Sequence, residues 1–275
     1  LFVSQSTVDM LRSLVQTRRF LQSDGFLSLG YQDGQPTKME VKAEDVENDA
    51  KQLEGLEILI RDYCDIAPCA AALKITKAQR EEYVAMLGES FTDTMLIASS
   101  ERALIYSDDL AFRLIAETKM DVAGVWTQAL LMHLLKAGKV PLADYQKAVI
   151  DLACLNYQHT SVDGEILVEA ARRSGWVPAV PFTKVVKLLG GQYCEESSAV
   201  RVGGDFFCLL WRERVLSSQR DYLVLSLFGA ITDGRPPNSV LKQLTTRIRI
   251  LFHLAPTVQA EFTSLAESWK KAHLV

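Results

Sequence analysis

Between residues 91 and 137, helical and strand-like stretches alternate, and only a few residues separate one from the next. Apolar spacing predicts helices over 91–101, 110–118 and 127–137, and short apolar runs predict strands over 103–107 and 122–125. Strands joined through helices run parallel, because each helix carries the chain back to the edge at which the strand began. Ligands in such sheets lie beyond the carboxyl ends of the strands. The alternation therefore predicts an α/β fold with a short parallel sheet and a site after residue 107.

The residues before this region predict one more strand, further helices and a polar insertion. Leu1–Val3 is apolar, and the following Ser4-Gln-Ser-Thr supplies an N-cap for a helix of about residues 8–20. Residues 23–54 are predicted to form a polar surface stretch, which includes a hairpin around 25–29 and 38–41 with an Asp-Gly turn at 33–34. Two helices are expected over 53–64 and 77–88.

Beyond Pro141 the pattern becomes helical. Only Ala199–Val202 resembles a strand in this part of the chain, so a helical C-terminal extension is expected over residues 175–275. The expected helices lie near 141–155, 163–174, 181–189, 204–216, 219–232, 238–253 and 257–272.

Charge and composition restrict the classes of function. The 275 residues carry a net charge of −4, which excludes a protein that coats nucleic acid through bulk positive charge. The same charge is compatible with a nuclease, because bound metal ions offset the negative charge of a carboxylate site.

The five cysteines are scattered, form no CxxC pair and have no histidine at ligand spacing. They predict buried thiols in a reducing cytoplasm and no zinc site. The longest strongly apolar run, near Leu223–Ile231, is too short to span a bilayer, so no membrane association is expected.

Three aspartates surround the predicted strand 103–107. Asp93 lies near the start of the preceding helix, and Asp108 and Asp109 follow the strand directly. Carboxylates that converge at the end of a strand can bind Mg²⁺ or Mn²⁺ for phosphodiester chemistry.

Each aspartate also has a structural explanation. Ser90-Phe-Thr-Asp93 fits a capping box, and Ser107-Asp-Asp precedes an apolar helix that Asp108 or Asp109 can cap. Capping accounts well for one residue of the adjacent pair and weakly for the second, because neighbouring carboxylates repel each other unless a cation or donor lies between them. Both interpretations stay open at this stage.

The order of these motifs resembles the core of PIN-domain nucleases. The resemblance rests on Asp93-x-x-Leu-Ile-Ala-Ser, a strand, Ser107-Asp-Asp-Leu, and Gly124-Val-Trp-Thr127 followed by a helix that ends in Lys136-Ala-Gly-Lys-Val140. It implies a three-layer α/β/α PIN-like domain over residues 1–165, with an insertion at about 20–55.

The resemblance also implies roles for individual residues. Asp93 and Asp108 are expected to be catalytic metal ligands, with Asp109, Asp9 and Glu89 as further candidates. Thr127, at a helix start, is expected to contact a phosphate or a metal-bound water. The cofactor would be Mg²⁺ or Mn²⁺, and the substrate single-stranded RNA.

The closest pattern is that of PIN-like domains at the ends of large bacterial multidomain proteins with tetratricopeptide repeats and a Gre-type module. The partners would then be other domains of the same polypeptide. The family's first strand, which ends in a metal-binding aspartate, has no counterpart here, so we expect it upstream of Leu1 in a longer polypeptide. The alternative is a catalytically inactive PIN-like interaction or scaffold domain.

Overall fold

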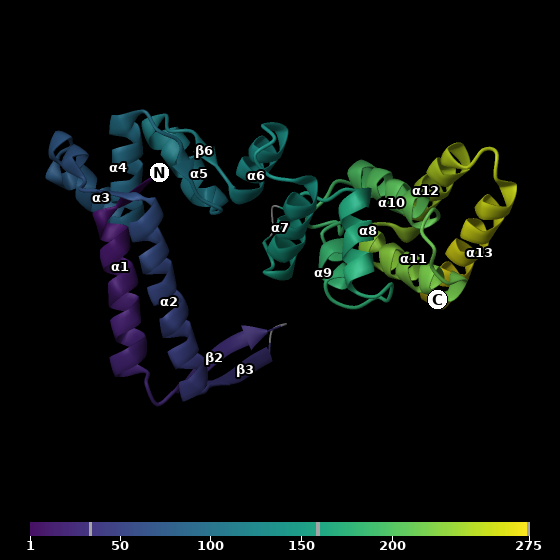
Figure 1. The fold of residues 1–275 in the computed structure, drawn as a ribbon, viewed down its shortest axis with the longest axis horizontal. Helices are drawn as coiled ribbons and strands as arrows, with labels where there is room; N and C mark the ends of the chain where they lie inside the picture. Colours follow the sequence, from purple (N-terminus) through teal and green to yellow (C-terminus); the bar gives the residue numbers. More distant parts are fainter. Residues whose placement is uncertain (33–34, 158–159, 274–275) are drawn as a thin grey trace. The chain divides into compact units, whose positions relative to one another are not determined.

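The computed structural model describes residues 1–32, 35–157 and 160–273. By contacts the chain divides into two compact units, unit 1 (Leu1–Thr127) and unit 2 (Gln128–Val275), and each is described by itself. Helices dominate, with short strands confined to the first part of the described chain (Figure 1).

Unit 1 combines helices with three pairs of short strands. Its strands are β1 (Phe2–Ser4), β2 (Phe26–Gln32), β3 (Gln35–Val41), β4 (Asp65–Ala67), β5 (Ile105–Tyr106) and β6 (Gly124–Val125). Its helices are α1 (Gln5–Gln16), α2 (Ala43–Tyr63), α3 (Lys77–Leu87), α4 (Glu89–Glu101) and α5 (Leu110–Met120), with a π-helical turn η1 (Thr17–Leu21) and a 3₁₀ turn η2 (Ala70–Lys74).

The parallel strands form two separate pairs. β1 pairs with β4, with Val3 opposite Ile66, and β5 pairs with β6, with Ile105 opposite Gly124. The predicted α/β class with short parallel strands and a helical C-terminal region is therefore confirmed.

The polar insertion is an antiparallel hairpin followed by a long helix. β2 and β3 pair along their whole length, which confirms the predicted hairpin, and its expected turn at Asp33-Gly34 lies outside the described residues. Figure 1 shows α1 and α2 side by side, with the hairpin at the far end of this helix pair from α4. Ion pairs tie the two helices together, including Arg12 with Glu57 at 2.9 Å.

Two features of unit 1 differ from the sequence-based expectation. The helix expected from residue 53 begins at Ala43, because a polar sequence that buries only Val46 and Ala50 still forms a helix when packed against α1. β4 was not predicted, since a strand of three residues leaves almost no periodicity in the sequence.

α4 is the best-buried helix of unit 1. Met95 and Ala98 pack with Ile105 of β5 and with Phe112 and Ala116 of α5. This small cluster fixes the β5–α5 segment, and therefore the position of Asp108 and Asp109, against α4.

Among its described residues, unit 2 contains helices joined by loops and no strand. Its helices are α6 (Thr127–Lys136, whose first residue belongs to unit 1), α7 (Leu142–Cys154), α8 (Gly164–Arg173), α9 (Phe182–Lys187), α10 (Glu196–Leu210), α11 (Ser217–Thr232), α12 (Pro237–Leu251) and α13 (Pro256–His273). The strand expected at Ala199–Val202 is wrong: these residues lie inside α10, where their apolar side chains face the core.

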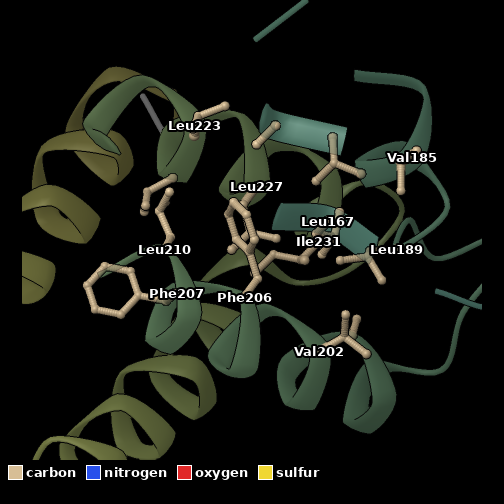
Figure 2. Packing of buried hydrophobic residues seen from close by; sticks show 14 of the residues in the cluster. Leu167, Val185, Leu189, Val202, Phe206, Phe207, Leu210, Leu223, Leu227 and Ile231 are labelled. Atoms are coloured by element: carbon tan, nitrogen blue, oxygen red, sulfur yellow. The ribbon is translucent and has the colours of Figure 1, made fainter. Parts of the chain in front are cut away.

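The core of unit 2 is formed mainly by α8, α10 and α11 (Figure 2). Phe206 and Leu227 are fully buried, and Figure 2 shows them among Leu167 and Ile231. Phe207 extends the core toward Phe262 of α13, with ring centroids 4.8 Å apart in an edge-to-face arrangement.

The contact division and the predicted domain boundary fall at different places. Contacts separate the chain at Thr127, whereas the sequence pattern placed the end of the PIN-like domain near residue 165, and that boundary stays a prediction. In the part of the chain that the structure describes, no helix combines the length and apolarity needed to cross a bilayer.

Glycine contacts in unit 2 give a stability prediction. A Cβ on Gly164 of α8 would lie 2.8 Å from the backbone nitrogen of Phe206, so Gly164→Ala should force α8 and α10 apart and cost about 1–3 kcal/mol. Gly229 of α11 has no atom within 4 Å of its Cβ position, so Gly229→Ala should stabilise the helix by about 0.5–1 kcal/mol. Urea unfolding of the whole chain, followed by tryptophan fluorescence, measures both; equal effects of the two substitutions would contradict the close approach of α8 and α10.

Candidate functional site

Glu89 and Asp93 lie on one face of α4, one turn apart. α4 begins directly after Gly88, whose φ of +81° reverses the chain between α3 and α4. Asp93 is buried, with 6% of its surface exposed, whereas the Glu89 side chain is 66% exposed. The structure therefore brings together two of the predicted site carboxylates, one buried and one open to solvent.

Arg80 of α3 pairs with both carboxylates. Its Nη2 lies 3.2 Å from Oε1 of Glu89 and 3.1 Å from Oδ1 of Asp93. A buried carboxylate is costly without a compensating charge, and the guanidinium of Arg80 supplies that charge. The sequence reasoning missed Arg80, because its pairing depends on how α3 folds back on α4.

Cys69 lies next to Asp93. Its thiol donates to the backbone carbonyl of Asp93 over 3.8 Å. Burial raises the pKa of the Cys69 thiol, and the negative charge of Asp93 raises it further. The charge of Asp93 therefore affects the ionisation of the thiol packed beside it.

Asp108 binds the start of α6. Its Oδ1 accepts the backbone N–H of Thr127 at 2.9 Å, and its Oδ2 accepts the Thr127 hydroxyl at 2.6 Å. The Tyr106 hydroxyl lies 2.7 Å from the same Thr127 oxygen. Asp108 and Thr127, both predicted site residues, are therefore brought together by the ends of β5 and β6, in direct contact with each other.

Asp109 caps α5. Its Oδ1 accepts the backbone N–H of Phe112 at 3.0 Å, as the capping interpretation requires. The adjacent carboxylates thus serve two different helix starts, because Asp108 caps α6 and Asp109 caps α5. Each is held by backbone donors, which lessens their mutual repulsion.

Arg113 and Gly124 hold the loop between β5 and α5. Arg113 is 8% exposed, donates to the carbonyl of Ser107 at 2.5 Å and lies over the Trp126 ring. A Cβ on Gly124 would lie 2.6 Å from the Arg113 side chain, which explains why glycine stands at this position in the motif.

Asp9 lies apart from this arrangement. It is on α1 with a side chain 57% exposed, accepts from the Gln5 amide at 2.9 Å and lies 3.5 Å from Arg12. These are contacts within one surface helix, and among the described residues they link Asp9 to none of the other predicted acids.

A cluster of hydroxyl groups joins α1, β1 and α4. Oγ of Ser4 lies 2.7 Å from the Thr7 hydroxyl and 3.3 Å from the Thr94 hydroxyl, and Thr7 lies 2.7 Å from that of Ser90. From the sequence, Ser4 and Ser90 were considered only as helix caps. The feature that could have predicted the hydroxyl cluster is the high density of serine and threonine at both helix starts.

The predicted metal ligands do not gather at one point among the described residues. Within residues 1–32, 35–157 and 160–273, no group of three or more histidine, cysteine, aspartate or glutamate side chains is placed to hold a metal ion. Glu89 and Asp93 offer hard carboxylate oxygens of the type that Mg²⁺ and Mn²⁺ prefer, but two such residues do not make a coordination sphere.

Comparison with protein families identifies the amino-terminal part of the chain. Residues 1–118 match the family model described as the PIN domain associated with the TPR-GreAB-C-PIN system. Comparisons with curated proteins and with solved structures gave no match. The match covers β1 through most of α5, including Arg80, Glu89, Asp93, Asp108 and Asp109. Residues 1–118 are therefore a PIN-like domain of the TPR-GreAB-C-PIN type.

Proposed function

We propose that this protein is a divalent-metal-dependent phosphodiesterase, a ribonuclease module of a longer bacterial polypeptide. The observation that carries the proposal is the buried carboxylate of Asp93 one turn from Glu89, within a PIN-like domain. PIN domains generally use divalent metal ions, and the family match suggests a nuclease-type module.

Each candidate residue would have its own role in such a metal site. A bound Mg²⁺ or Mn²⁺ would activate water and offset charge on the phosphate oxygens. Asp93 and Glu89 would hold the ion, and displacement of Arg80 would free their oxygens for it.

Asp108 would contribute a further ligand while keeping its structural contacts. A carboxylate offers about four lone-pair sites, and the two bonds from Thr127 leave others free. Asp109 would serve as a ligand or bind through water, and Asp9 would act only after a movement of α1 toward the other acids. Thr127 would contact phosphate only if that phosphate replaced Asp108 as acceptor.

The substrate proposed from the family resemblance is single-stranded RNA. We place the protein in the cytoplasm, where its cysteines stay reduced; Cys64, Cys69, Cys154, Cys194 and Cys208 are all free thiols. The partners would be the other domains of a TPR-Gre polypeptide.

A second candidate is a catalytically inactive PIN-like interaction or scaffold domain. It is favoured by the structural contacts of the acids. Arg80 pairs with Glu89 and Asp93, and Asp108 and Asp109 cap helices. In that case the carboxylates stabilise the fold and bind no metal.

Metal binding by the complete domain of the longer polypeptide separates the two candidates. Loss of free Mn²⁺ signal in electron paramagnetic resonance titrations measures binding, and cleavage of labelled single-stranded RNA measures activity. Asp93→Asn should weaken Mn²⁺ binding about tenfold or more and lower cleavage in parallel, because it removes a ligand charge. Asp62→Asn, the same change at an exposed position of α2, should alter neither. If that complete wild-type domain binds no Mn²⁺, the enzyme proposal is wrong and the scaffold is favoured.

Two substitutions at Asp108 separate its structural role from a catalytic one. Asp108→Asn keeps an acceptor for Thr127, so it should preserve most of the stability while lowering Mn²⁺-dependent cleavage. Asp108→Ala removes both bonds and should cost about 1–3 kcal/mol in urea unfolding. Unchanged cleavage in Asp108→Asn would limit Asp108 to capping.

Arg80 should compete with metal for the α4 carboxylates. Arg80→Gln removes the cation that pairs with Asp93, so Mn²⁺ binding should become about three- to tenfold tighter, a gain of about 0.7–1.4 kcal/mol. Lys77→Gln removes the same charge from the exposed start of α3, where Lys77 pairs only with Glu81 in the described contacts, and should leave the affinity unchanged. Equal effects of both substitutions would indicate general electrostatics instead of direct competition.

A further inference from the structure

Unit 2 contains a basic groove of about 550 Å³ between α10 and α12, two helices that pack against each other (Figure 1). Three cationic side chains line it, Arg201 from α10 and Lys242 and Arg247 from α12. The rest of its described lining consists of hydroxyl, amide and apolar side chains, and none of these lining residues is acidic. The α10–α12 groove therefore presents positive charge and neutral hydrogen-bonding groups to a ligand.

Few acids offset the three cations. Nη2 of Arg247 lies 2.7 Å from Oδ1 of Asp205, and Nη1 of Arg201 lies 3.8 Å from Oδ2 of the same carboxylate. The contacts of the described residues give Lys242 no acidic partner. Glu196 is the one further acid in contact with the described lining, and it accepts from the amide of Gln243 at the amino-terminal end of α12. Positive charge is therefore in surplus in the groove.

Arg247 is held in a fixed position. A Cβ on Gly204 would lie 2.6 Å from Cδ of Arg247, so the aliphatic part of this side chain runs directly over the backbone of α10. Asp205 fixes one end of the guanidinium, yet 33% of the Arg247 side chain stays exposed. A guanidinium that is already oriented loses little conformational entropy when it binds an anion.

The groove is long compared with a single small anion. Its lining on α12 runs from Ser239 to Leu251, which is about 18 Å along the helix axis. Lys242 and Arg247 lie about 7.5 Å apart along that axis. A chain that carries repeated negative charges can meet these cations one after another. The Arg201 side chain is 57% exposed, and a guanidinium of this kind can stack on an unpaired base.

Charge is divided unevenly between the two units. Residues 1–127 contain 13 lysines and arginines and 21 aspartates and glutamates, a net charge of −8, whereas residues 128–275 contain 17 and 13, a net charge of +4. The candidate metal site belongs to the negative unit, whose net charge repels a polyanionic substrate. Attraction of such a substrate therefore depends on unit 2.

We propose that the α10–α12 groove binds the phosphodiester backbone of single-stranded RNA through Arg201, Lys242 and Arg247. The choice of RNA rests on the proposed ribonuclease function, whereas the choice of a flexible polyanion rests on the length and charge of the groove. Phosphate contacts carry no base specificity, so RNA of any sequence should bind. The groove lies outside residues 1–118, so it is a binding site in addition to the PIN-like domain.

RNA binding by the whole chain in EDTA tests the proposal apart from metal chemistry. The probe is a fluorescent single strand of about twelve uridines, followed by anisotropy. We expect a Kd of about 1–100 μM at about 0.15 M salt, as for other sequence-independent contacts with nucleic acid. Three cations that displace counterions from a single strand should give a slope of about 2 when log Kd is plotted against log salt concentration.

Matched variants that each remove one positive charge locate the binding surface. Lys242→Gln should weaken RNA binding about three- to tenfold and lower the salt slope by about 0.7, because one phosphate contact is lost. Lys271→Gln, at an exposed position of α13, should change neither quantity. Arg201→Gln should act like Lys242→Gln, with Arg214→Gln at an exposed loop position as its control. All four positions are exposed, so the urea unfolding midpoints should stay unchanged.

Three results would overturn the proposal. They are no RNA binding at about 100 μM protein and low salt, equal losses in Lys242→Gln and Lys271→Gln, and equally tight binding of polyglutamate of the same charge, which would indicate an acidic protein partner. RNA binding in EDTA without Mn²⁺ binding by the complete domain would support the groove and contradict the proposed enzyme. Mn²⁺-dependent cleavage without RNA binding in EDTA would do the reverse.

Discussion

Burial of α4 is the constraint on which the rest of unit 1 depends. Thr92, Asp93, Met95, Leu96, Ile97 and Ala98 are all buried, so the helix has packed neighbours on most of its faces. A carboxylate in such a helix needs a cation, and Arg80 provides it. The same helix packs Met95 and Ala98 against β5 and α5. The ion pair and the small core are thus consequences of one buried helix.

Four predicted site carboxylates of unit 1 have structural contacts of their own. Asp108 and Asp109 hold the starts of two helices, which fixes their positions at the ends of the short strands. Asp93 and Glu89 share a single guanidinium, which offsets part of their combined negative charge. In the proposed metal site, an ion would enter by exchange with Arg80, so that fold stability and metal affinity would be coupled through one residue.

Regular elements with strong periodicity were predictable, and short or polar ones were not. The alternation from α4 to α6 and the helices of unit 2 follow from apolar spacing that tertiary contacts reinforce. The polar first half of α2 and the three-residue β4 gave no such signal, since packing against α1 and pairing with β1 stabilise them. Ala199–Val202 was wrongly expected to be a strand because a buried helix and a buried strand have similar apolar runs.

The sequence alone determined the α/β class, the caps of α1 and α5, and the candidate acids, because these depend on neighbours within a few residues of each other. Tertiary structure decided what each acid contacts. Arg80 reaches Asp93 across 13 positions and Asp108 reaches Thr127 across 19, and contacts at such separations depend on how helices and strands pack together. The same packing, and no local pattern, paired β1 with β4 and β5 with β6.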